Sequence, residues 1–352
     1  MTGPRRETET SRETETRREN PFRLPHARAG QTGLPLRPHK YRDEEGYYVG
    51  IDRTEQSLAE FRQEVTPEDV AEDGRLVLIT GREGSGKTSL LNRCVAWFCA
   101  EAEGTAPETP PGPARQRTRT IVVDLVHEDP RPASIPGRAT EVCRRIVREL
   151  GKVAQRGNWG TSFRDRIPTI DSRELLDSVE LGHVHLDISD LLVDLEDARA
   201  GRFLLVVMLP GCLDTPVPEV TNYLRWVRPR LLFLMESSSF EGGHLETRGA
   251  GVPPLVLQVG DLGSTDGWLF VRNRLTRDGT ELTTPPTMTE ETMTELMENG
   301  ISIARLQRLM HGVYSDVLAG GQPTTEITMD EINKFTRRSW INSPSRNGGG
   351  TA

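Results

Sequence analysis

Long apolar runs, closely spaced cysteine pairs and an export signal are all missing from the sequence. No stretch approaches the roughly 20 consecutive apolar residues that a membrane-spanning helix needs. The first residues, MTGPRRETETSRETETRRE, contain no apolar segment of the kind that directs secretion. The 4 cysteines show no C-x-x-C spacing and lie in apolar segments, a pattern typical of reduced, buried thiols. We therefore expect a soluble, cytoplasmic protein that does not enter membranes.

The balance of charge is acidic, and this limits the partners that the chain can attract. The formal net charge is −8, which opposes non-specific binding to the phosphate backbone of nucleic acids. The basic run Arg115-Gln116-Arg117-Thr118-Arg119 belongs to the Pro/Gly-rich stretch 101–118, and a solvated loop explains it more simply than a DNA contact does. A nucleic-acid partner is therefore not expected.

Composition and periodicity divide the chain into four parts. Residues 1–40 are Thr/Glu/Arg-repetitive and then Pro-rich, so we predict a disordered tail. Residues 41–262 alternate strand-like and helix-like segments, which predicts an α/β core of three layers around a parallel sheet. Residues 263–340 contain helix patterns and no convincing strand, which indicates a small all-helical domain. Residues 341–352 read as a flexible tail.

The strongest functional signal lies in residues 75–92, RLVLITGREGSGKTSLLN. The run Leu76–Ile79 predicts a strand buried on both faces, and the dense apolar positions after Ser89 predict a largely buried helix. Between them, GREGSGKT is a full match to G-x-x-x-x-G-K-[ST]. A glycine-rich turn without a ligand is the alternative reading. The strand before the motif and the helix after it favour a phosphate-binding loop, the Walker A motif.

The residue types of this loop fit the chemistry of a nucleotide. Glycines permit positive φ and close approach of the backbone, so that successive N–H groups can surround a phosphate chain at a helix N-terminus. Lys87 is expected to reach the β- and γ-phosphates, and the Thr88 hydroxyl to ligate Mg²⁺. No guanine-specifying N-K-x-D motif is present, which favours ATP over GTP. The expected nucleotide contacts are Gly81, Arg82, Glu83, Gly84, Ser85, Gly86, Lys87, Thr88 and Ser89.

The order of these parts resembles the AAA+ superfamily and the related STAND NTPases, in particular bacterial relatives of the initiator-type, origin-recognition-like branch. The segment Tyr48-Val49-Gly50-Ile51-Asp52-Arg53 is similar to the box that precedes the phosphate loop in that group. The passage from Val259 to Ser264 looks like the entry into the helical lid, and residues 303–309 look like the lid helix. The resemblance implies ATP and Mg²⁺ as ligands, self-association, a protein partner, and Arg305 as the sensor-2 arginine.

The chain departs from that family at the acids that support hydrolysis. The third strand ends in FLLVVMLPGCLD, so Leu209 and Pro210 occupy the positions where the resemblance implies carboxylates. Neither side chain can hold a metal-bound water or accept a proton. Three substitutes remain open. Asp214 follows the expected acidic positions by several residues. Glu236 stands at the tip of the fourth strand, which in the family's strand order lies next to the phosphate-loop strand. Asp124 ends the strand that we expect to be the outer one.

Two further groups of side chains have a functional and a simpler reading. His183 and His185 have the spacing of metal ligands on one face of a strand, but the sequence offers no partner cluster of Cys or His. Arg228 and Arg230 precede the fourth strand and could act as arginine fingers toward a neighbouring subunit. A solvated helix end is the simpler reading of these arginines.

These observations favour an ATP-binding switch, in which nucleotide bridges core and lid and changes how a partner docks. The missing acids predict weak or slow hydrolysis. The alternatives are an active ATPase remodeller, which needs working acids, and an initiator-like DNA-associated ATPase. A small-molecule kinase is the remaining class, and the box at residues 48–53 and the helical lid argue against it.

Overall fold

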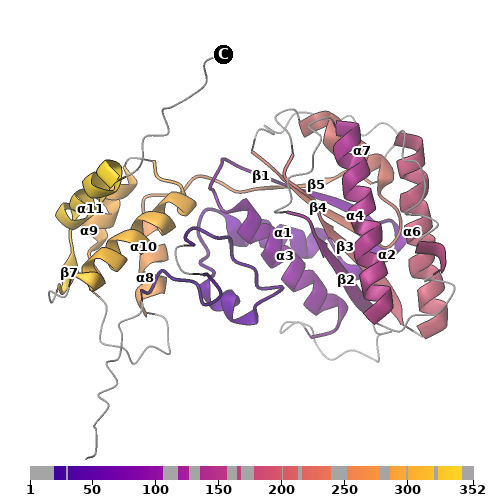
Figure 1. Cartoon of the computed structure of the whole chain (residues 1–352), viewed down its shortest axis with the longest axis horizontal. Coiled ribbons are helices and arrows are strands. Elements are labelled where there is room, and N and C mark those ends of the chain that lie inside the picture. Colours follow the sequence, from indigo (N-terminus) through magenta and orange to yellow (C-terminus); the bar gives the residue numbers. More distant parts are fainter. Residues whose placement is uncertain are drawn as a thin grey trace, which may run out of the picture.

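The computed structural model of the chain has two lobes, one built around a sheet and one built from helices (Figure 1). The sheet lobe is followed along the chain by the helical lobe, which begins shortly after the last strand of the sheet. The residues that the structure describes are 20–28, 31–105, 118–126, 135–156, 165–167, 178–199, 201–212, 216–238, 252–276, 286–298, 300–320 and 324–342.

Within the described residues, five parallel strands form the larger sheet in the order β2-β3-β4-β1-β5. Because all the strands run the same way, their carboxyl ends meet at one edge of the sheet. The order confirms the predicted parallel α/β core, with β4 between the phosphate-loop strand and the third strand and with β2 at the outside. The strands are β1 (Arg75–Thr80), β2 (Thr118–Asp124), β3 (Arg202–Met208), β4 (Leu231–Ser237) and β5 (Leu255–Gln258).

Helices cover both faces of this sheet, which is why the central strands read as continuous apolar runs. On one face lie α1 (Thr54–Glu64), α2 (Pro67–Glu72) and α3 (Lys87–Ala102). On the other lie α4 (Ile135–Arg156), α6 (Ser178–Arg199) and α7 (Pro216–Trp226). A short 3₁₀ helix, η1 (Arg42–Tyr47), precedes α1. The two apolar layers include Leu58, Phe61, Leu90 and Phe98 on the first face and Val142, Ile146, Val184 and Tyr223 on the second.

The helical lobe has its own apolar core. Its helices are α8 (Asp266–Thr276), α9 (Glu290–Met297), α10 (Ile303–Ala319) and α11 (Met329–Asn342). The core includes Phe270, Met293, Leu306, Met310 and Tyr314. Two short strands, β6 (Thr287–Met288) and β7 (Glu326–Ile327), pair in parallel beside the helices. No sequence pattern predicts this pair, because two residues are too few for a visible alternation.

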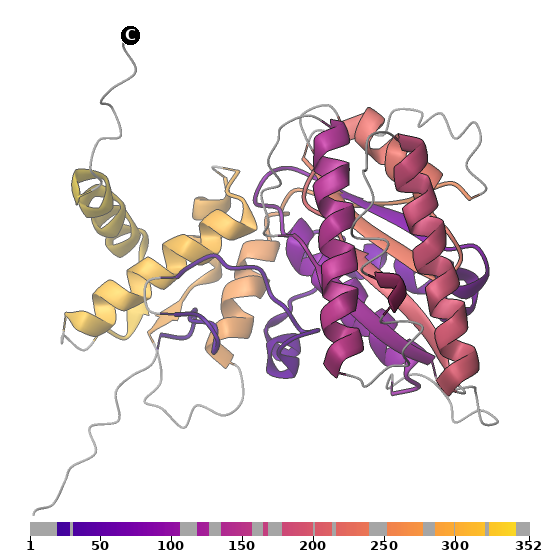
Figure 2. The same cartoon turned by 45° about the vertical axis from the view of Figure 1, so that its right-hand side comes forward.

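A segment before the sheet lobe lies between the two lobes in both views (Figures 1 and 2). We call its described residues, 20–28 and 31–40, the N-terminal segment. Phe22 is buried in the core of the helical lobe, and its carbonyl oxygen accepts a hydrogen bond from Gln307 Nε2 at 2.6 Å. Leu36 is bound to α3, because its N–H donates to Ser89 Oγ at 3.1 Å and its carbonyl accepts from Asn92 Nδ2 at 2.8 Å.

The prediction of a disordered tail over residues 1–40 is therefore wrong for the N-terminal segment. Its apolar side chains Phe22, Leu24, Ala27 and Leu36 are buried against other parts of the chain. Burial of this kind offsets the conformational entropy that a proline-rich, polar segment otherwise keeps. Residues 1–19, 29 and 30 lie outside the described residues, as does the tail after residue 342.

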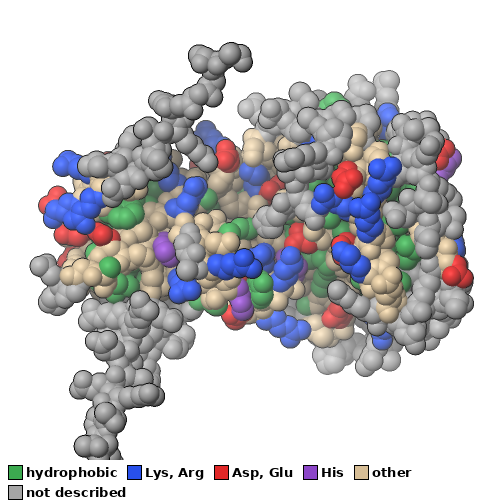
Figure 3. All heavy atoms as spheres, viewed as in Figure 1, with side chains coloured by type: hydrophobic (Ala, Val, Ile, Leu, Met, Phe, Trp, Pro, Cys, Tyr) green, Lys and Arg blue, Asp and Glu red, His purple; other side chains and the backbone are tan. Residues whose placement is uncertain are grey.

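The surface carries charges of both signs. Figure 3 shows Lys and Arg side chains interspersed with Asp and Glu side chains on the face of the molecule that Figure 1 presents. No helix in the described part of the chain is both long enough and apolar enough to cross a membrane. All four cysteines, Cys94, Cys99, Cys143 and Cys212, carry free thiols.

Candidate functional site

The glycine-rich loop joins the carboxyl end of β1 to the start of α3, as the sequence predicts. Gly84 and Gly86 have φ values of 76° and 100°, which side chains other than glycine rarely adopt. A Cβ atom on Gly84 would also lie 2.8 Å from Ser302 Oγ, at the start of α10. Small residues here therefore allow both the curl of the loop and the close approach of the helical lobe. The loop leads directly into the N-terminus of α3, where the helix dipole favours an anion.

Lys87 is the first residue of α3 and is held inside the loop. Its ammonium donates hydrogen bonds to the carbonyl oxygens of Gly81 at 2.9 Å and Arg82 at 2.8 Å. Burial lowers the pKa of Lys87, and the nearby carboxylates of Glu236 and Glu83 act in the opposite direction. A buried ammonium bound only to neutral carbonyls is poised to exchange them for an anion, because a charged acceptor gives the stronger hydrogen bond.

Glu236 lies directly beside the loop. The hydroxyl of Thr88 donates a hydrogen bond to Glu236 Oε2 at 2.8 Å. This contact follows from the strand order, because β4 pairs with β1 and Glu236 lies opposite Ile79 in the ladder. A hydroxyl and a carboxylate side by side are the kind of hard oxygen donors that Mg²⁺ prefers.

The end of β3 contributes no acid among the residues described there. Leu209 and Pro210 are buried, and the Leu209 N–H donates to the carbonyl of Leu234 on β4. The chain then folds around the tip of β4, where the Cys212 N–H donates to the carbonyl of Glu236 at 2.8 Å. This segment, where the resemblance implied carboxylates, instead gives backbone support to Glu236.

A buried ion pair fixes this supporting segment from the side. Arg138 on α4 donates from Nη2 to the carbonyl oxygen of Gly211 at 2.7 Å. Its Nε lies 3.2 Å from Glu219 Oε1 on α7, and both side chains are almost fully buried. The sequence offered no signal for this pair, because its members are far apart along the chain and come together only through the packing of two helices.

The other predicted acids and the predicted sensor lie elsewhere. Asp124 ends the edge strand β2 and forms an ion pair with Lys40 of the N-terminal segment. Asp214 lies outside the described residues. Arg305 is exposed on α10 and does not line the cavity next to the loop. The structure therefore brings Glu236 to the phosphate loop, and it brings neither Asp124 nor Arg305 there.

The candidate histidines and arginines also lie away from the loop. His183 and His185 are on the helix α6 and not on a strand, so their spacing does not place them on one face. His185 is buried, with its ring stacked on Trp226 and its Nδ1 2.7 Å from the carbonyl oxygen of Leu181. Arg228 and Arg230 precede β4, at the edge of the sheet opposite to the phosphate loop.

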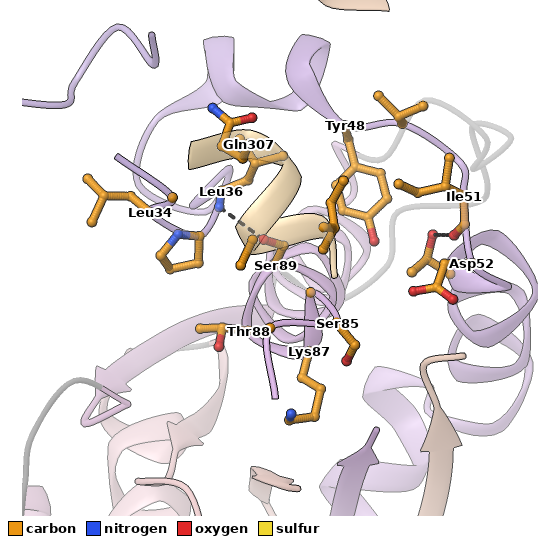
Figure 4. A pocket seen from close by; sticks show the side chains of 18 of the residues that line it. Leu34, Leu36, Tyr48, Ile51, Asp52, Ser85, Lys87, Thr88, Ser89 and Gln307 are labelled. Atoms are coloured by element: carbon orange, nitrogen blue, oxygen red, sulfur yellow. Dashed lines mark hydrogen bonds between the residues drawn. The ribbon is translucent and has the colours of Figure 1, made fainter. Parts of the chain in front are cut away.

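A cavity of about 340 Å³ opens above the loop, within the range of small-molecule sites. Its walls come from three sources: the sheet lobe, the N-terminal segment and the helical lobe. Figure 4 shows Leu34 and Leu36 on one side, Asp52 beside Ile51 on the other, and Ser85, Lys87 and Thr88 between them. Gln307 of α10 also lines this space. Apolar lining side chains include Leu24, Leu34, Leu36, Ile51, Phe270 and Ile303.

Two charged residues that line this cavity escaped the sequence analysis as site residues. Arg274 of α8 is buried, donates from Nη1 to the carbonyl of Tyr47 at 2.5 Å, and packs its guanidinium over the rings of Tyr47 and Phe270. Burial lowers the pKa of Arg274 to about 9. Asp52 is also buried, at the end of the box before α1. No local pattern marked either residue, because Asp52 is followed by Arg53 and Arg274 closely follows Arg272.

Proteins similar to this chain were found among solved structures, at low similarity. No protein-family profile matches the chain, and no curated protein is significantly similar to it. Among solved structures, the Orc1 protein of Aeropyrum pernix, solved in complex with DNA, is similar over 86% of this chain and 69% of its own, with 12% identity and a TM-score of 0.49. The Cdc6p protein of Pyrobaculum aerophilum is similar over 86% and 74%, with 13% identity and a TM-score of 0.44.

A mutant RuvB of Thermotoga maritima is similar over 88% of this chain and 75% of its own, with 12% identity and a TM-score of 0.41. These neighbours are AAA+ P-loop ATPases, the superfamily that the sequence resembles. Their identities to this chain are 12–13% and their TM-scores lie below 0.5, so the likeness carries no statement about the function of this chain.

Proposed function

We propose that the protein is a nucleotide-dependent switch that binds ATP with Mg²⁺ between its two lobes and hydrolyses it slowly. One observation carries the proposal: the phosphate loop opens into a cavity whose walls belong to the sheet lobe, the N-terminal segment and the helical lobe. A ligand in this cavity touches all three, so its affinity depends on how they are arranged. By linkage, the ligand then changes that arrangement.

The roles of the loop residues follow from their contacts. The amides of residues 84–88 surround the phosphate chain, and Lys87 exchanges its two carbonyl partners for phosphate oxygens. Thr88 and Glu236 would hold Mg²⁺, which would supply positive charge to offset the negative charge of the phosphates. The described residues contain no group of three or more His, Cys, Asp or Glu side chains suited to a metal. That fits Mg²⁺, which is commonly held by one or two protein groups together with phosphates.

Slow turnover follows from the count of acids. The acidic residues that line the cavity are Asp52, Glu83 and Glu236. Glu236 is engaged by Thr88, Glu83 is exposed on the loop, and Asp52 lies beyond Ser85 in Figure 4. If Glu236 holds the metal, none of these residues is left as a second carboxylate positioned to accept a proton from the attacking water. We therefore propose turnover well below the median enzyme rate of about 10 s⁻¹.

The partner is a further part of this proposal. A switch needs a second molecule that reads its two arrangements, and the resemblance supports a protein partner and self-association. The four free thiols fit a protein of the reducing cytoplasm. An active remodeller would need an acid that the end of β3 does not supply, so it ranks second.

Nucleotide binding should depend on Lys87. We expect Lys87→Ala to weaken ATP binding at least about tenfold, because a charge-assisted contact with phosphate is worth about 1.5–3 kcal/mol. Isothermal titration calorimetry of wild type and variant measures this directly. Lys152, which is exposed on α4 and away from the cavity, gives the matched control Lys152→Ala. Equal affinities of wild type and Lys87→Ala would contradict the phosphate-loop assignment.

The switch itself is tested by hydrogen exchange. Gly84 of the loop accepts a backbone hydrogen bond from Ala304 of α10 at 3.1 Å, so the phosphate site and the helical lobe are in contact. We expect ATP to slow exchange in residues 295–318 more than ADP does, and Lys87→Ala to remove the difference. Identical exchange with both nucleotides would leave a binding protein and rule out the switch.

A further inference from the structure

Asp52 has a combination of features that its own packing does not explain. Only 6% of its surface is exposed, and within the described part of the chain neither carboxylate oxygen has a hydrogen-bond partner. Buried polar groups are normally paired, because an unpaired one costs the free energy of its lost hydration. Asp52 lines the cavity beside the phosphate loop. A buried, unpaired acid at a ligand cavity indicates that the ligand supplies the partner.

The backbone around Asp52 is strained in a way that holds it there. Asp52 and Arg53 have φ values of 63° and 61°, a left-handed pair that two non-glycine residues rarely adopt in succession. Behind the side chain, Gly260 leaves just enough room, since a Cβ atom on that glycine would lie 3.1 Å from Asp52 Oδ1. The Gly260 N–H in turn donates to the Asp52 carbonyl at 3.3 Å. The turn and the glycine together position the carboxyl group.

We propose that Asp52 is the residue that selects the nucleobase, by pairing with the amino-bearing edge of adenine. The inference rests on the proposed function, since it assigns a role within the same nucleotide site. Figure 4 shows Asp52 beside Ile51 on the side of the cavity opposite to Leu34 and Leu36. A planar base held between such apolar walls presents its polar edge to whichever hydrogen-bonding group lies at its rim.

The protonation state of Asp52 decides which base it fits. Adenine offers one donor and one acceptor side by side, which matches a neutral carboxyl group with one O–H donor and one acceptor oxygen. Guanine offers two adjacent donors, which match an ionised carboxylate. Burial, with the charges of Asp266 and Asp261 adding to it, raises the pKa of Asp52 to about 7. The neutral form is therefore well populated near neutrality, and this form favours adenine.

The charged groups around Asp52 all enter this balance. Asp261 lies on the chain between β5 and α8, and Asp266 is the first residue of α8. Asp261 is itself paired with Arg82 at 3.2 Å. Arg53 follows Asp52 directly in the chain. Other charged residues that line the cavity are Glu83, Lys87, Glu236 and Arg274. The two aspartates act on Asp52 in the same sense as burial, against ionisation.

The test compares three variants by calorimetry with MgATP and MgGTP. We expect wild type to bind ATP at least about tenfold more tightly than GTP, a ratio typical of a satisfied buried hydrogen-bond pair. Asp52→Ala should bring the ratio to within about threefold of unity. Asp52→Asn, which carries a permanent donor and acceptor, should keep the preference for ATP. Asp190→Asn, at an exposed acid of α6 that does not line the cavity, controls for a general effect of charge.

The dependence on pH gives a second readout. Ionisation removes the O–H donor of Asp52. As the pH rises from about 6 to about 8, wild type should therefore lose affinity for ATP relative to Asp52→Asn, whose donor does not titrate. An unchanged ATP/GTP ratio in Asp52→Ala would overturn the inference, and so would equal losses for both nucleotides, which would place Asp52 at the ribose. Tighter binding of GTP by wild type would overturn it as well. If wild type binds neither nucleotide, the proposed function itself fails.

Discussion

The contact between Thr88 and Glu236 makes a sharp prediction about magnesium. Glu236→Gln keeps the length and shape of the side chain and removes its charge. The Thr88 hydroxyl can still donate to the amide oxygen, so the phosphate loop should keep its form. What is lost is the carboxylate that we propose to hold the metal with Thr88, and the nearest acid that could orient water.

The magnitude follows from the kind of interaction that is removed. A hydrogen bond or metal contact of a charged group in a shielded site is worth about 1.5–3 kcal/mol, and about 1.4 kcal/mol corresponds to a factor of ten in affinity. We therefore expect Glu236→Gln to weaken binding of MgATP by roughly 10- to 150-fold. Binding of ATP without Mg²⁺ should stay the same or improve, since a negative charge near the phosphates has gone.

Calorimetry with MgATP and with ATP in EDTA, on wild type and Glu236→Gln, measures both quantities, and phosphate release measures turnover. Residual hydrolysis should disappear in the variant. Asp124→Asn is the matched control, because this acid ends the edge strand β2 and does not line the cavity. An unchanged magnesium dependence in Glu236→Gln, or brisk hydrolysis that survives it, would refute the assignment. Loss of the magnesium dependence and of hydrolysis in Asp124→Asn would identify Asp124 as the acid that acts at the site.

Two predictions concern stability. Arg138→Met leaves the buried Glu219 without its guanidinium partner and should lower the free energy of unfolding, measured by urea titration, by about 3–5 kcal/mol. The double variant Arg138→Met/Glu219→Leu should recover most of that loss. Equal losses in the single and the double variant would contradict the ion-pair account. Burial lowers the pKa of His185 to about 4, so the unfolded chain takes up a proton at a higher pH than the folded one, and stability should fall as the pH drops from about 6.5 toward 4. Urea midpoints of His185→Leu should vary less over that range than those of wild type, and equal pH dependence would remove His185 as the cause.

The N-terminal segment illustrates a limit of reasoning from composition. Proline-rich, polar sequence averages to a prediction of disorder, and in isolation that segment has no surface on which to bury Phe22 or Leu36. Phe22 is buried in the core of the helical lobe, and the backbone of Leu36 is hydrogen-bonded to α3. Both contacts join the segment to parts of the chain far beyond residue 40, and no local pattern records them.

The sequence by itself determined the parts of the site whose chemistry is local. Eight contiguous residues, Gly81 to Thr88, predict a phosphate loop, because glycine dihedrals, the lysine and the helix start are all properties of neighbouring residues. The alternation of strand-like and helix-like segments likewise predicted the parallel core, and helix patterns after residue 262 predicted the helical lobe. The same reading showed that Leu209 and Pro210 cannot serve as acids.

Only the tertiary structure decided which side chains complete that loop. Glu236 reaches Thr88 because β4 pairs with β1, and Arg305 misses the cavity because of the rotational position of α10. Asp52 is buried and unpaired because a left-handed turn and Gly260 hold it against the cavity. These contacts join residues that are distant in sequence, and their geometry is set by strand register, helix rotation and burial, all of which arise only when the whole chain packs.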